Sequence, residues 1–318
     1  MFNAIPDFKT AILLRHKLNS GLKDSLIHIS DAINDVIEKK SFENYKYIIN
    51  KLDVSKKINP LLFMVNAKLI EKINLQDINY VQIAINNINR LDDLQIDDIL
   101  ICSNEHIDIY FQKLFYDLAA YDRQTKPLIK NFDFDDFSIN KIRFFSALKL
   151  IKYYSYDIYQ EFDTFSSLIL FLNGDHIKAG SSHNAFGMIY IAQEYVKSIE
   201  EMIDTLVHEA AHQYLHLISF FDPLIKNSPE ERYEAPLRKE KRPLIGIFHA
   251  VFVISRLIYL YKKINTSSLI NNLELTFFET KLHYYSMRYY NGVEILNRYA
   301  KFTDIGKDIF NNMKLIIG

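Results

Sequence analysis

Turn-forming residues are scarce in this chain, and that scarcity limits its fold more than any other feature of the sequence. Only 8 glycines and 7 prolines occur among the 318 residues. An all-β protein needs many tight turns, which glycine and proline usually provide. Apolar residues instead recur every three or four positions through most of the chain, which is the spacing of one buried helical face. The sequence therefore predicts a mainly α-helical protein.

The helical pattern is interrupted once by a different period. Residues 167–172 and 186–191 are short apolar runs, and the first is followed by the turn residues Asn173-Gly174-Asp175. Such runs are typical of buried strands. Helices are expected in the following ranges: 8–40 and 42–75 (two helices each, the second range broken near Asn59-Pro60), 77–91, 105–120, 139–162, 244–262 and 267–318. We therefore expect a mainly α fold with a small β-sheet, an α+β arrangement.

Composition and charge narrow the class of protein. Hydrophobic residues make up 49% of the chain and the net charge is -1, so nothing in it suggests a binder of nucleic-acid backbone. Cys102 is the only cysteine, which excludes a disulfide framework and indicates a buried, inert thiol. The longest apolar run, 244–261, is interrupted by His249, Ser255 and Arg256, which argues against a membrane span. We expect a cytoplasmic protein without a nucleic-acid or membrane partner.

A His-Glu-x-x-His motif spans His208 to His212, inside a strongly amphipathic segment. Residues four apart lie one above the other on a helix, so His208 and His212 can direct two imidazoles at one metal ion, with Glu209 beside them. Ser198, three residues before Glu201, resembles a capping box at the start of this helix. We therefore predict metal binding in the second half of the chain. Residues 1–163 are expected to form a helical N-terminal region, a candidate for peptide binding, and residues 164–318 the metal-binding catalytic region.

The third metal ligand decides the class of chemistry. In one zinc peptidase layout a third histidine follows six residues after the second, but that position is Ile218. His216 lies about 12 Å along the helix axis from His208, at 1.5 Å per residue, which makes it a poor third ligand. Another zinc layout uses a later glutamate, and the candidates Glu230, Glu231 and Glu234 fall in a polar stretch. His249, on a buried helix, is the better candidate.

Two arginines flank His249 on the same helical stripe. Arg242, His249 and Arg256 are seven residues apart, so they share nearly one side of the helix. A buried guanidinium requires an anion. An imidazole between two arginines is unusual for a helix with a purely structural role.

The motifs resemble those of the His-Glu-x-x-His peptide-modification family, whose members accompany ribosomally made, post-translationally modified peptides. The resemblance rests on Leu206 to His212, on Tyr233-Glu234-Ala235-Pro236-Leu237-Arg238 and on Arg242 to Ala250, in matching order and spacing. It is clearest over residues 179–261. Leu237 stands where a tryptophan is common in the family, and the helical N-terminal region resembles no family that we can name.

The resemblance implies an iron(II)- and 2-oxoglutarate-dependent peptide β-hydroxylase. His208, His212 and His249 would then be the metal ligands, and Glu209 an orienting carboxylate or proton acceptor. Three protein ligands leave open positions on iron for a 2-oxoacid and oxygen. The distal carboxylate of 2-oxoglutarate needs a fixed cation, and a forked arginine is suited to it. The candidates are Arg242, Arg256 and Arg238, and the implied partner is a ribosomal precursor peptide.

Two other interpretations remain open from the sequence. One is a zinc metallopeptidase of the His-Glu-x-x-His type, in which Glu209 activates a water molecule. The other is a helical peptide-binding protein with a vestigial site. The metal content and the dependence of turnover on iron(II) and 2-oxoglutarate separate these alternatives.

Overall fold

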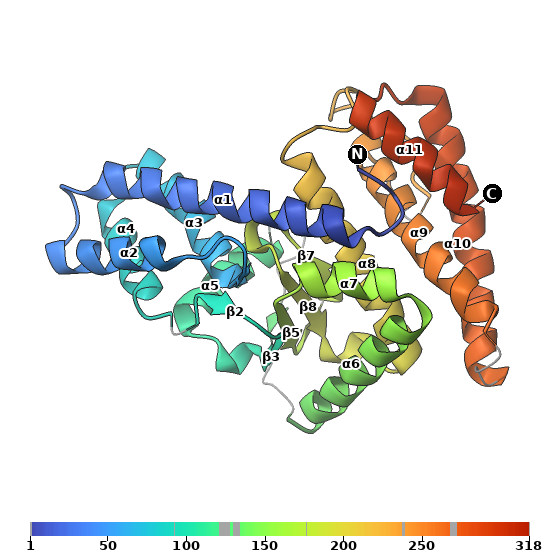
Figure 1. Cartoon of the computed structure of the whole chain (residues 1–318), viewed down its shortest axis with the longest axis horizontal. Helices are drawn as coiled ribbons and strands as arrows, with labels where there is room; N and C mark the ends of the chain where they lie inside the picture. The colour runs from blue at the N-terminus through green and yellow to red at the C-terminus, as the bar shows by residue number, and fades with distance from the viewer. Residues whose placement is uncertain are drawn as a thin grey trace. The chain divides into compact units, whose positions relative to one another are not determined.

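The computed structural model describes residues 2–91, 93–120, 128–129, 134–175, 177–236, 239–267 and 272–317. Within these ranges the chain is mainly helical and includes a small sheet (Figure 1). The predicted fold class, mainly α with a small β part, is confirmed.

The chain forms two compact units that are interleaved in sequence. Unit 1 contains residues 1–11, 139–162 and 196–318, and unit 2 contains residues 12–138 and 163–195. The predicted division at 163/164 does not separate these units. The sheet strands belong to unit 2, whereas the His-Glu-x-x-His helix belongs to unit 1. Residues 139–162 were expected in the N-terminal region but belong to unit 1, with most of the C-terminal helices. Residues 163–195 were expected in the C-terminal region but belong to unit 2.

Unit 2 contains helices α1 to α5 and the sheet. The helices are α1 Phe8–Ile33, α2 Lys39–Lys51, α3 Pro60–Asn74, α4 Ile78–Ile88 and α5 Ile109–Ala120, with short 3-10 turns η1 Asn104–His106, η2 His183–Ala185 and η3 Gln193–Tyr195. The N-terminal segment expected as two helices over 8–40 is one long helix. The predicted break at Asn59-Pro60 is confirmed, because Asn59 caps α3 and Pro60 occupies its first turn.

The sheet has four strands in the order β3-β5-β8-β7. Their bounds are β3 Leu100–Ser103, β5 Leu168–Leu172, β7 Ala179–Ser181 and β8 Met188–Ala192. β5 pairs in parallel with β3 and β8, whereas β7 is antiparallel to β8. Every residue of β5 is buried, as expected for a central strand covered on both faces. Two strand pairs complete the unit: β1 Lys57–Ile58 with β2 Gln95–Ile96, and β4 Leu128–Ile129 with β6 Gly174–Asp175.

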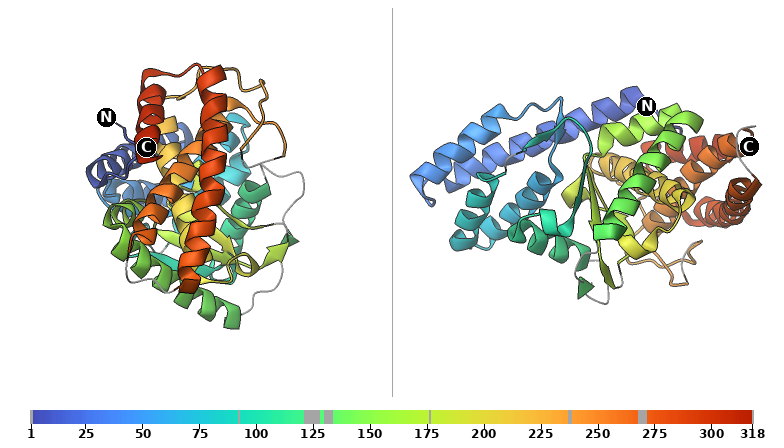
Figure 2. Two further views of the ribbon diagram at one scale, coloured as in Figure 1. Left: turned by 90° about the vertical axis from the view of Figure 1, so that its right-hand side faces the viewer. Right: turned by 90° about the horizontal axis from the view of Figure 1, so that it is seen from below.

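Unit 1 is built from helices. They are α6 Phe134–Tyr154 and α7 Tyr156–Phe165, of which residues 139–162 fall in this unit, followed by α8 Ile199–Ser219, α9 Leu244–Asn265, α10 Asn272–Tyr299 and α11 Asp304–Ile317. The single helix predicted over 139–162 is divided at Ser155. In both views of Figure 2, α9 and α10 lie side by side along their lengths.

α9 is the central helix of unit 1. By length and composition it could cross a membrane, with a mean hydropathy of 1.9 over 18 residues, but 72% of that window is buried inside the protein. A helix covered by its own protein is a core helix, and burial on almost all sides explains why its sequence is apolar nearly all round. This burial is consistent with a protein that is not embedded in a membrane.

Candidate functional site

α8 carries a polar stripe on an otherwise buried helix. The helix begins at Ile199, where the Ser198 side chain accepts a hydrogen bond from the Glu201 backbone at 3.1 Å, as the capping signal predicts. Asp204, His208, His212 and His216 then follow at intervals of four residues and are all half-buried. Because this spacing returns to one side of a helix, the stripe presents three imidazoles and a carboxylate together.

α9 brings a fourth imidazole to this stripe. The ring centroids of His208 and His212 are 5.0 Å apart, and the His249 ring of α9 lies 6.1 Å from the His212 ring. The side chains come from residues 37 to 41 positions apart in sequence, so only the packing of α8 on α9 gathers them. The three histidines singled out in the sequence therefore lie in one cluster.

His216 also belongs to this histidine cluster, which sequence reasoning had set aside. Its ring centroid is 6.1 Å from that of His212 and 5.9 Å from that of His249. The distance along α8 does separate His216 from His208, but His212 lies between them on α8, and the His249 ring is near the rings of both His212 and His216. The repeated four-residue interval was the signal in the sequence that marked His216.

The cluster offers nitrogen donors suited to a transition metal, although its rings are more open than a closed metal site. Two imidazoles that share one ion place their ring centres about 5 Å apart, because a metal–nitrogen bond is about 2.1 Å long. The ring centroids of His208 and His212 have this spacing, whereas those of His212 and His249 are about 1 Å further apart. Among the described residues, no three His, Cys, Asp or Glu side chains converge as a metal-binding group. The imidazole nitrogens are donors that transition metals accept, and the rings of His212, His216 and His249 are spaced more widely than in a closed site.

Burial affects the protonation of this cluster. Protein packed around His249 lowers the pKa of its imidazole to about 4, although part of the side chain stays exposed. The ring is therefore neutral near pH 7, which is the form that ligates metals. Glu209, on the same turn as His208, is buried. A buried carboxylate beside imidazoles can orient a ligand or hold a proton.

The predicted carboxylate-binding arginines have different surroundings. Arg256 is fully buried, and its guanidinium pairs with Glu161 of α7 through contacts of 3.1 and 3.2 Å. It also lies over the rings of Tyr214 and Phe252. Its anion is therefore Glu161, so Arg256 is a structural residue in this fold and is not available to a 2-oxoacid.

Arg242 remains available for a ligand. Its backbone pairs with Tyr233 in a short antiparallel bridge, with both hydrogen bonds at 2.8 Å, just before α9 begins. Its side chain is exposed. Arg238 lies outside the described residues. The alternative ligands Glu230, Glu231 and Glu234 are exposed in the same connecting segment.

Asp204 closes the N-terminal end of the stripe. Its carboxylate accepts hydrogen bonds from the hydroxyls of Tyr261 and Tyr285, the latter at 3.1 Å, and pairs with Lys281 at 3.3 Å. Burial, with Asp204 close by, raises the pKa of the Tyr261 hydroxyl. These contacts join α8, α9 and α10, so Asp204 has a structural role.

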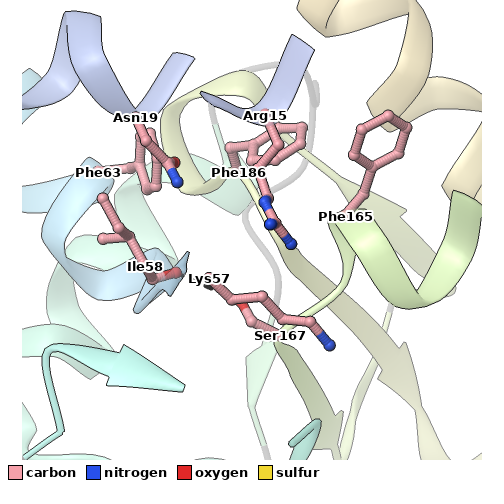
Figure 3. Close-up of a pocket in the computed structure, with 8 residues that line it drawn as sticks. All are labelled: Arg15, Asn19, Lys57, Ile58, Phe63, Phe165, Ser167 and Phe186. Carbon is pink, nitrogen blue, oxygen red and sulfur yellow. Dashed lines mark hydrogen bonds between the residues drawn. The ribbon is translucent and has the colours of Figure 1, made fainter. Parts of the chain in front are cut away.

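The pocket in unit 2 is too small for a metabolite. It is lined in part by Arg15, Lys57, Ser167 and Phe186, and its volume is about 10 Å³, room for about one water molecule (Figure 3). The Arg15 guanidinium already donates to the backbone carbonyls of Ser55 at 2.6 Å and Thr164 at 3.3 Å. We therefore place the candidate site at the histidine cluster of unit 1.

No protein-family model matches the chain, and no curated protein matches it significantly.

Proposed function

We propose that the chain is an iron(II)- and 2-oxoglutarate-dependent enzyme that hydroxylates a β-carbon in a ribosomally synthesised peptide. The observation that carries this proposal is that His212 of α8 and His249 of α9 lie close together, with ring centroids 6.1 Å apart. The motif order of the resemblance requires a later histidine to join the His-Glu-x-x-His pair. A zinc peptidase of either layout considered above would instead use a residue elsewhere.

Each residue has a defined part in this proposal. His208, His212 and His249 would hold the iron, and the neutral imidazole of His249 can do so without releasing a proton. Glu209, which is buried and follows His208 in the chain, would act as an orienting carboxylate or proton acceptor. Arg242 would contact a carboxylate of the bound molecules. The bound iron and 2-oxoacid supply the oxidising chemistry, and the protein orients the peptide carbon.

The proposed setting is the cytoplasm, where precursor peptides are made. The burial of α9 within unit 1 supports a protein outside the membrane. The peptide partner is proposed from the resemblance.

Co-expression with a precursor peptide encoded beside this gene provides the test. Mass spectrometry should detect one added oxygen on the peptide, and the purified enzyme should release succinate only with both iron(II) and 2-oxoglutarate. His249→Ala should abolish metal binding, whereas the exposed His283→Ala in α10 serves as a matched histidine control. Cleavage of the peptide by zinc-bound protein would favour the peptidase. If the wild type and His208→Ala bind the peptide equally well and neither turns it over, the site is vestigial.

A further inference from the structure

The small cavity of unit 2 is lined by parts of the chain that are far apart in the sequence. Arg15 and Asn19 come from α1, Lys57 and Ile58 form β1, and Ser167 immediately precedes β5. In Figure 3 the Arg15 side chain points from α1 toward Lys57 and Ser167. The volume of about 10 Å³ limits the contents of the cavity to one water molecule or one ion of similar size.

Two hydrogen-bond donors of the cavity residues are buried and poorly satisfied. The Nε atom of Arg15 is buried and has no hydrogen-bond partner. Ser167 is 1% exposed, and its hydroxyl reaches only the carbonyls of Ile58 and Gly187, at 3.4 and 3.5 Å. An O–H donor normally lies closer to its acceptor than this. Buried donors are rarely left unsatisfied, so the two groups indicate an acceptor inside the cavity.

The charges around the cavity are not balanced among the described residues. Arg15 donates to the neutral backbone carbonyls of Ser55 and Thr164 and forms no ion pair with a described carboxylate. Lys57 pairs with Asp163 at 3.1 Å, but the Lys57 side chain is only 10% exposed, whereas that of Asp163 is 48% exposed. Burial lowers the pKa of Arg15, and the attraction of Asp163 offsets only part of this effect. Two cations therefore line the cavity beside one half-exposed carboxylate.

We propose that this cavity binds a single chloride ion. Chloride accepts hydrogen bonds and donates none, so it can take the unsatisfied donors of Arg15 and Ser167 and also offset the charge of the guanidinium. A water molecule could accept the same hydrogen bonds but would leave the charge unbalanced. The cavity is too small for a phosphate or an organic acid, whereas chloride is only slightly larger than water.

The position of the ion predicts what it does. It would connect α1 with the segment that leads into β5, and those donors converge only in the folded chain. A ligand that binds only the native state lowers the unfolding equilibrium constant by the factor 1 + [chloride]/Kd, which is about tenfold when chloride is at ten times its Kd. The site belongs to unit 2, so it does not depend on the function proposed for the histidine cluster.

The test uses two measurements on the full chain. Urea unfolding is followed while sodium gluconate, whose anion is too large for the cavity, is replaced stepwise by sodium chloride at constant ionic strength. Chlorine NMR detects bound chloride directly, through broadening of the chloride signal. Arg15→Met should lose both the chloride-dependent stabilisation and the broadening. Ser167→Ala removes one hydroxyl donor and should weaken chloride binding by about 10-fold, since a hydrogen bond to a charged group is lost.

Arg232→Met is the matched control. Arg232 also donates to backbone carbonyls, those of Pro229 and Glu231, but it is exposed and does not line the cavity. This variant should keep the wild-type response to chloride in both measurements. Wild-type protein that is equally stable in chloride and gluconate, and broadens the signal no more than Arg15→Met does, would show that the cavity holds only water and would overturn the proposal. If Arg15→Met does not fold, an unchanged chloride affinity of Ser167→Ala would overturn it instead.

Discussion

At the scale of single residues, the histidine stripe shows how a local repeat becomes a site. The four-residue interval from Asp204 to His216 is a property of α8 alone, and the sequence displays it. The use of each position depends on its neighbours in space. Asp204 contacts Tyr261, Tyr285 and Lys281. The rings of His212 and His216 lie 6.1 and 5.9 Å from the His249 ring.

His216→Ala tests which histidines of the cluster are metal ligands. If His208, His212 and His249 are the ligands, His216 supports them from outside, and its loss should weaken metal affinity by about 10–100-fold without changing the number of ions bound. Metal titration of His216→Ala beside His208→Ala measures this. If His216→Ala binds no metal and His208→Ala still binds it, the ligands are instead His212, His216 and His249.

Cys102 should be almost unreactive in the native protein. Its side chain in β3 is half-buried and not fully buried as expected from the sequence, and the protein packed around it raises the pKa of the thiol to about 12. The thiolate is the reactive form, so at pH 8 only about one thiol in 10,000 can react, against roughly a quarter of free thiols. Alkylation should therefore be roughly a thousandfold slower than in urea and should accelerate as the pH approaches 12. Fast modification at pH 8 would contradict the raised pKa.

At the scale of elements, close contacts between helices and loops depend on the few glycines. A Cβ atom at Gly306 of α11 would overlap the backbone carbonyl of Leu224, and one at Gly292 of α10 would overlap Val251 of α9. Backbone cannot move aside as a flexible side chain can. These glycines therefore set how closely α10 and α11 approach their neighbours.

Gly306→Ala should lower the free energy of unfolding by about 1–3 kcal/mol, because the added methyl group overpacks a rigid contact. Gly21→Ala is the matched control. Nothing lies within 4 Å of a Cβ at Gly21, which is inside α1, so this change should stabilise the protein by about 0.5–1 kcal/mol. Urea denaturation measures both, and equal effects of the two substitutions would contradict the proposed overlap.

At the scale of the whole molecule, the two units exchange segments along the chain. Residues 139–162 complete unit 1, and they carry Glu161, the partner of Arg256. Asn3 likewise donates its backbone N–H to the Tyr214 hydroxyl within unit 1. A division of the sequence at 163/164 therefore removes contacts that the histidine-bearing unit needs.

The fragment 164–318 should fail to fold cooperatively. It leaves the Arg256 guanidinium buried without Glu161, and breaking a buried ion pair costs about 3–5 kcal/mol, a large part of the stability of a typical domain. Urea titration followed by near-ultraviolet circular dichroism should show no sigmoidal transition, whereas the full chain should show one. A native-like spectrum from the isolated fragment would show that unit 1 does not depend on residues 1–11 and 139–162.

The sequence by itself determined the features that arise from neighbours along the chain. The helical fold class, the caps at Ser198 and Asn59, and the common face of His208 and His212 follow from periodicity and local hydrogen bonding. The placement of His249 beside that face was predicted from motif order, and its ring does lie 6.1 Å from His212.

Only the tertiary structure decided which distant groups meet. It paired Arg256 with Glu161, brought His216 into the histidine cluster, added β3 to the sheet and joined residues 139–162 to the C-terminal helices. The physical reason is that such contacts depend on how whole helices pack and cross, and apolar periodicity shows which face of a helix is buried but not which partner buries it.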